Sequence, residues 1–129
     1  MPNELSEFSW TFNSPVVSWF FCGQRIVKEY AYPLMSANVL RDGTGVAVVE
    51  PYKVPGSSEP NRKNAVIFNA DGTERVRLGF PIPETEVYWF NDFYYIGEEL
   101  TAILLIPGHD WALVVDESTG KYLRRYETR

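Results

Sequence analysis

Three tight-turn signals at nearly even spacing are the sequence feature that most constrains how this chain can fold. They are Cys22-Gly23, Asp71-Gly72 and Thr119-Gly120, and their glycines lie 49 and then 48 residues apart. Glycine suits such turns because it adopts positive φ without steric cost. Each turn follows an apolar run and precedes an alternating run, which indicates a buried strand followed by an outer strand with one wet face. The sequence therefore predicts three β-hairpins.

The intervals between the hairpins have room for two further strands each. The strands expected from this pattern are 17–21, 26–30, 35–40, 46–50, 65–69, 75–78, 87–96, 100–106, 112–116 and 122–126. The run from Leu100 to Ile106 is apolar on both faces, which is typical of a strand sandwiched between layers. This run is therefore expected in the core and not in a binding surface.

Little of the chain favours helix, because Pro, Gly and β-branched residues interrupt almost every long window. The exception is a helical turn from Asn3 to Phe8. The longest loop, Pro51 to Lys63, is either a mobile surface insertion or a recognition loop.

The repeating unit has the size of a propeller blade, which is four strands in about 40 to 50 residues. The segment from Asn64 to Val76 and its echo from Trp111 to Arg124 resemble the blades of β-propellers. The resemblance implies antiparallel blade-like sheets in one all-β domain over residues 1–129, with two full units and a third hairpin. A closed propeller needs at least about four blades. We therefore expect a half-propeller or a β-sandwich, the alternative being chains that associate to bury an exposed blade face.

Acidic charge is concentrated in one stretch of the chain. Between Leu78 and Gly120 there is no lysine or arginine but there are eight acidic residues, so the rest of the chain has a net charge of +3. The same stretch holds eight aromatic residues. An acidic field combined with aromatic anchors suits a surface that binds a basic partner. The alternative for each acidic pair is a hydrated strand edge that prevents sheets from aggregating.

The candidate protein-binding residues come from this stretch. They are Glu84, Glu86, Trp89, Asp92, Tyr94, Glu98, Glu99, Asp110 and Trp111. The carboxylates are expected to steer a partner and pair with its charges, and the three aromatic residues are the anchor candidates. Phe90, Phe93 and Tyr95 are expected in the core. If no second layer covers the other side of their strand, the remaining aromatic face becomes a binding patch.

No set of residues in the chain predicts catalysis, a cofactor or a metal. One histidine and one cysteine exclude a zinc site of nitrogen and sulfur ligands within a single chain. Glycine-rich phosphate loops and the G-x-S-x-G elbow are absent from the sequence. His109 and Asp110 are sequence neighbours, which on a strand point apart, and Cys22 has no evident activating group beside it. We therefore expect a protein that is not an enzyme.

The charge and the cysteine content also bear on partners and location. A net charge of −5 disfavours nucleic acid and anionic membranes as ligands. The first residues do not read as a secretory signal, the apolar runs are too short to span a bilayer, and a lone cysteine fits a reducing compartment. The expected location is the cytoplasm.

In these properties the chain resembles small acidic bacterial toxin-immunity proteins. The resemblance implies a non-enzymatic inhibitor that neutralises a basic partner protein such as a toxin nuclease. One alternative is a structural module that forms a homo-oligomer through an open sheet edge. Another is a small-molecule or carbohydrate-binding module with Trp10, Trp19, Trp89 or Trp111 as a stacking platform.

Overall fold

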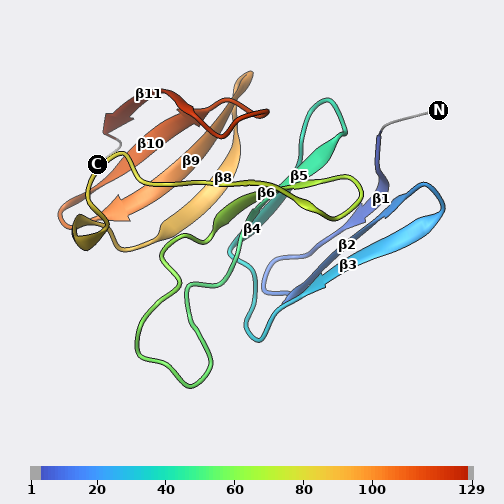
Figure 1. Ribbon diagram of the computed structural model, residues 1–129, viewed down its shortest axis with the longest axis horizontal. Helices are drawn as coiled ribbons and strands as arrows, with labels where there is room; N and C mark the ends of the chain where they lie inside the picture. The colour runs from blue at the N-terminus through green and yellow to red at the C-terminus, as the bar shows by residue number, and fades with distance from the viewer. Residues whose placement is uncertain (1–3, 128–129) are drawn as a thin grey trace.

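The computed structural model describes residues 4–127, which form eleven strands and one short 3-10 helix, η1 (Glu84–Glu86). The strands make three antiparallel sheets that follow one another along the chain (Figure 1). The first sheet holds β1 (Ser6–Ser9), β2 (Val16–Phe21) and β3 (Gln24–Glu29). The second holds β4 (Ser36–Val39), β5 (Gly45–Val49), β6 (Ala65–Asn69) and β7 (Glu74–Arg77). The third holds β8 (Phe90–Ile96), β9 (Glu99–Ile106), β10 (His109–Val115) and β11 (Tyr122–Glu127).

The predicted fold class is confirmed, since the molecule is all-β and built of open antiparallel sheets of three or four strands. The predicted hairpins are β2–β3, β6–β7 and β10–β11, and the glycines of their turns all have positive φ. In each sheet the strand after the turn lies at the edge, which explains its alternating sequence.

The expected helical turn from Asn3 to Phe8 is wrong for its described part, because residues 6–9 form strand β1. Asn3 itself lies outside the described residues. Leu5 and Phe8 pack against the apolar cluster between the first two sheets, and this tertiary contact outweighs the local preference. The first unit therefore has three strands, one more than the predicted hairpin.

The second sheet lies between the other two and buries both of its faces. Val46, Val48 and Val66 contact the first sheet, where Trp19 is the largest buried side chain. The alternate residues Ala47, Val49, Ala65 and Ile67 face the third sheet and pack against its residues Phe90, Phe93 and Leu104. Because side chains alternate across a strand, β5 and β6 read as continuous apolar runs.

The same contact between neighbouring sheets occurs twice. A Cβ added to Gly72 in the β6–β7 turn would lie 2.8 Å from Ile26 of the preceding sheet. One added to Gly120 in the β10–β11 turn would lie 2.6 Å from Val76. The equivalent Gly23 has no atom within 4 Å at that position, since no sheet precedes its own. The even spacing of the turns therefore reflects a structural repeat.

Side-chain amides add hydrogen bonds between the second and third sheets. Asn64 is fully buried; its Nδ2 donates to the carbonyl of Phe90 at 2.9 Å, and its Oδ1 accepts from the Phe90 N–H at 2.8 Å. Asn38 Nδ2 donates to the carbonyl of Phe93 at 2.8 Å. Because β8 is an edge strand of the third sheet, the backbone groups on its free edge have no neighbouring strand to bond. The amides of Asn64 and Asn38 satisfy some of these groups where the second sheet meets the third.

The longer connections between strands meet at one end of the molecule, which we call the loop end. It comprises 10–15, 30–35, 50–64 and 78–89, and the loop 50–64 projects furthest from the sheets (Figure 1). The tight turns lie at the opposite end. Within residues 4–127, no helix is long and apolar enough to cross a membrane.

Candidate functional site

Four of the nine candidate residues lie on the side of the third sheet that faces away from the second. We call this side the outer face of the third sheet. It consists of Asp92, Tyr94, Ile96, Glu99, Thr101, Ile103, Leu105, Asp110, Ala112, Val114, Arg124 and Tyr126. Directly paired residues share a face, so the strand register places these side chains together.

The register arranges the outer face in rows across the strands. One row runs Tyr94, Thr101, Val114, Arg124 and the next runs Asp92, Ile103, Ala112, Tyr126. Small or branched side chains therefore occupy the middle of the face, with tyrosines toward its two edges.

The centre of this face is apolar, and no other part of residues 4–127 forms a layer over it. Tyr94, Ile96 and Tyr126 are 37%, 43% and 43% exposed, and Ile103 and Leu105 are half-buried. The expectation that Leu100 to Ile106 is covered on both sides is therefore wrong. Its inward residues pack on the second sheet, but Ile103 and Leu105 belong to the outer face, where a partner can reach them.

The outer face and the adjoining turn are acidic. Asp92, Glu99 and Asp110 lie on the face with one cation, Arg124, which pairs with Glu99. Glu98 in the β8–β9 turn accepts a hydrogen bond from Arg41 of the second sheet's β4–β5 turn at 2.7 Å. Exposed ion pairs of this kind contribute about 0–1 kcal/mol, so a partner's cation can replace either arginine. Residues 78–129 carry the whole net charge of −5, and residues 1–77 sum to zero.

Trp111 lies on the opposite, inner side of β10. It packs against the core, and the guanidinium of Arg125 lies over its ring at 4.1 Å. Its indole Nε1 is buried and has no hydrogen-bond partner among the described residues. In this arrangement Trp111 supports the third sheet from within and does not share the outer face with Tyr94.

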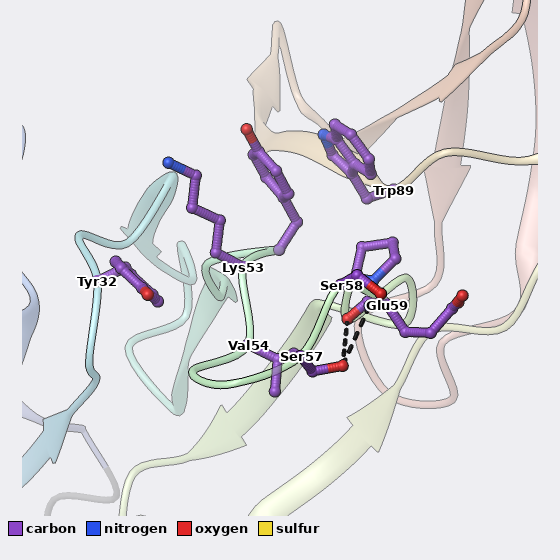
Figure 2. Close-up of a pocket in the computed structure, with 9 residues that line it drawn as sticks. Tyr32, Lys53, Val54, Ser57, Ser58, Glu59 and Trp89 are labelled. Atoms are coloured by element: carbon purple, nitrogen blue, oxygen red, sulfur yellow. Dashed lines mark hydrogen bonds between the residues drawn. The ribbon is translucent and has the colours of Figure 1, made fainter.

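The remaining candidates, Glu84, Glu86 and Trp89, lie at the loop end. Both glutamates are exposed in η1. Trp89 is half-buried and stacks on Tyr52 of the long loop, with ring centroids 4.0 Å apart and planes 5° apart. With Tyr32 and Lys53 this stack lines an open hollow of about 300 Å³ (Figure 2). The structure thus divides most of the predicted acidic-aromatic stretch between two regions, the outer face and the loop end, which adjoin where the Leu105 N–H donates to the carbonyl of Trp89 at 2.9 Å.

The tryptophan positions bear on carbohydrate binding. Trp19 is fully buried and its Nε1 donates to the carbonyl of Ala70 at 2.7 Å, so it is no stacking platform. Trp10 packs against the cluster between the first two sheets. Trp89 has Tyr52 stacked on it and Tyr88 at 5.7 Å with a 43° tilt.

The groups considered for chemistry lie apart. His109 Nε2 is 3.0 Å from a carboxylate oxygen of Glu127, and its ring stacks near Trp111. Cys22 is exposed in the β2–β3 turn. The described residues contain no cluster of three or more His, Cys, Asp or Glu side chains that could hold a metal ion.

Most of the shifted pKa values belong to turns and to contacts between sheets. Hydrogen bonds from the hydroxyl and N–H of Thr73 lower the pKa of Asp71. The N–H groups of Ser118 and Thr119 lower the pKa of Asp116. Burial, together with a hydrogen bond to Glu117, raises the pKa of Tyr95 to about 12. On the outer face, the hydrogen bond to the Glu99 carboxylate raises the pKa of Arg124.

The fold and the site define an all-β protein of three blade-like sheets with an uncovered acidic-aromatic face. No protein-family model and no curated protein matches the chain. Its fold is similar to that of a chain in the structure of Tne2 in complex with Tni2, with a TM-score of 0.66. The likeness covers 93% of this chain and 82% of that one at 16% sequence identity, and at that identity it shows the fold alone.

Several residues of the two regions were not among the candidates. Ile96, Ile103, Leu105 and Tyr126 complete the outer face. The signal for Ile103 and Leu105 was in the sequence, since β9 is apolar on both sides. Tyr32, which joins the hollow from 30–35, carried no sequence signal.

Proposed function

We propose that this chain is an immunity-type protein, a non-enzymatic inhibitor that binds a basic partner protein through the outer face of the third sheet. The observation that carries the proposal is that β9 is apolar on both sides while one side alone is covered. On this face Tyr94, Ile96 and Tyr126 are exposed and Ile103 and Leu105 are half-buried, and such a group of exposed apolar side chains on one face is typical of a surface that docks on another protein.

Charge favours a basic partner over a second copy of this chain. The net charge of −5 resides in residues 78–129, which include the third sheet, so two copies repel each other at this face. A partner with a basic surface is attracted instead, and complementary charge accelerates association. Tyr94 and Tyr126 supply the large, partly exposed side chains that serve as anchors.

The class of partner follows from the same chemistry. A nuclease that acts on nucleic acid presents a concentrated basic site, which an acidic face with an apolar centre can cover. The similar fold in the structure of Tne2 in complex with Tni2 supports binding to another protein as the mode of action. We therefore propose a toxin nuclease as the partner and the cytoplasm as the place where the two meet.

The test uses two matched substitutions on the two end sheets. Tyr94→Lys places a cation on the outer face of the third sheet, and Val27→Lys makes the same type of change at a 50% exposed residue of the first sheet. The chain and both variants are co-expressed with the protein encoded beside this gene in its source organism. We expect the unaltered chain and Val27→Lys to protect the cell from that protein and to bind it in a pull-down at low salt. Tyr94→Lys should neither protect the cell nor bind the protein.

Equal protection by all three proteins would refute the proposed face. A mass in solution of twice the chain or more, without any partner, would favour the self-associating module instead.

A further inference from the structure

Two hollows adjoin at the loop end, beside the outer face. Trp89 lines the first hollow, and its carbonyl accepts a hydrogen bond from the N–H of Leu105, an outer-face residue, at 2.9 Å. The first has a volume of about 300 Å³ and the second about 200 Å³. Tyr32, Tyr52 and Lys53 line both of them, so these side chains form the ridge between the two. Figure 2 shows Lys53 on the Tyr32 side of the first hollow and Glu59 at its other end. Both hollows are shallow and open, which suits an elongated ligand better than an enclosed small molecule.

Three hydrogen-bond donors on the aromatic walls have no partner within residues 4–127. The hydroxyls of Tyr32 and Tyr52 and the indole Nε1 of Trp89 make no hydrogen bond to any residue of the described range 4–127. Donors on aromatic walls select a ligand that combines apolar rings with free acceptors.

The loop that carries Tyr52 is held in place before any ligand arrives. Its base is closed where Glu50 N–H donates to the carbonyl of Asn64, and the Asn61 N–H donates to the carbonyl of Tyr52, both at 2.7 Å. Arg62 Nη1 donates to the carbonyl of Val87 at 2.6 Å and so ties the loop to the segment before Trp89. A preorganised site loses less entropy on binding. These bonds favour the interpretation of 51–63 as a recognition loop.

We propose that the two hollows bind an extended, proline-containing peptide segment that is acidic toward Lys53 and basic toward Glu59. Such a segment has no internal hydrogen bonds, so its carbonyls accept from the three free donors. Its prolyl rings pack against the aromatic side chains that line the two hollows, as such rings do in aromatic grooves that bind peptides of this kind. A sugar is a poorer fit, because the rings of Trp89 and Tyr52 stack on each other and Tyr88 lies against Trp89.

The charges at the two ends of the first hollow set the direction of the peptide. Neither the ammonium of Lys53 nor the carboxylate of Glu59 takes part in an ion pair within the described residues. Each is therefore free to pair with an opposite charge on the ligand. This proposal does not rest on the proposed function, since its test measures peptide binding and the hollow-lining side chains are not those of the outer face.

The test titrates the purified chain with the capped synthetic peptide Asp-Pro-Pro-Ala-Pro-Lys and follows tryptophan fluorescence. Three comparison probes are its proline-to-alanine counterpart, the charge-reversed peptide with Lys first and Asp last, and a mixture of cello- and malto-oligosaccharides. Tyr32→Ala and Tyr52→Ala are the test variants. Phe12→Ala removes an 80% exposed aromatic from another loop and is the control.

We expect the first peptide to bind the chain and Phe12→Ala equally, and to bind each tyrosine variant about tenfold more weakly. Charge reversal should also weaken binding. The proposal is overturned if the alanine peptide binds as well as the proline peptide. It is also overturned if the oligosaccharides bind and the peptide does not, or if no binding is seen at about 1 mM peptide. Tyr32 makes no hydrogen bond in the described fold, so Tyr32→Ala keeps the test informative if Tyr52→Ala fails to fold.

Discussion

Replacing Asn64 by alanine tests how the second and third sheets are held together. The substitution removes the bonds to the N–H and the carbonyl of Phe90, at 2.8 and 2.9 Å, and a third bond to the carbonyl of Glu50 at 3.0 Å. Asn64 and Phe90 are both fully buried, so the groups left behind have no water to bond. An unsatisfied buried donor or acceptor costs about 1–3 kcal/mol.

We expect Asn64→Ala to lower the free energy of unfolding by about 3–5 kcal/mol, since the separate costs do not add fully. For a chain of this size that corresponds to a fall in Tm of about 10–20 °C. The control is Asn61→Ala, because the Asn61 side chain makes no hydrogen bond to any residue between 4 and 127. Guanidinium denaturation followed by tryptophan fluorescence measures both variants. A difference between them below about 0.5 kcal/mol would refute the role assigned to Asn64.

Two further predictions concern the repeat and the contact between sheets. Gly120→Ala and Gly23→Ala impose similar strain at φ +76 and +79, but the first alone brings a Cβ to 2.6 Å from Val76. In thermal unfolding Gly120→Ala should therefore be the less stable by about 1–3 kcal/mol, and equal Tm values would contradict the repeat contact. The pKa of Tyr95 is about 12 in the folded state and near 10 in the unfolded chain. Its contribution to stability is therefore complete below pH 10 and is lost as pH rises toward 12. Tyr95→Phe should flatten the fall of the denaturation midpoint across that pH window, and an unchanged slope would show that Tyr95 does not titrate as described.

Local chemistry was enough to predict the hairpins and the sheet architecture. Glycine at the three turns and the apolar runs before them each act within a few residues of sequence, so their structural consequences could be inferred directly. The strand Ser6–Ser9 could not, because Leu5 and Phe8 become part of a core only when the second sheet is present.

The candidate site was predictable in its chemistry but not in its geometry. Arg41 lies 57 residues before Glu98 in sequence, and only the packing of two sheets brings the pair together. A bulge between Phe90 and Asp92 determines which residues of β8 lie on the outer face, and no residue type in this segment predicts the bulge. The apolar run of β9 did indicate a second covered side, and the missing cover is what the proposed partner supplies.

The most direct test of the central claim is the dissociation constant of Tyr94→Lys for the protein that the chain neutralises, beside that of Val27→Lys. A partner seated on the outer face of the third sheet predicts about hundredfold weaker binding for Tyr94→Lys and less than about twofold change for Val27→Lys. Equal dissociation constants for the two variants, with both folded, would contradict it.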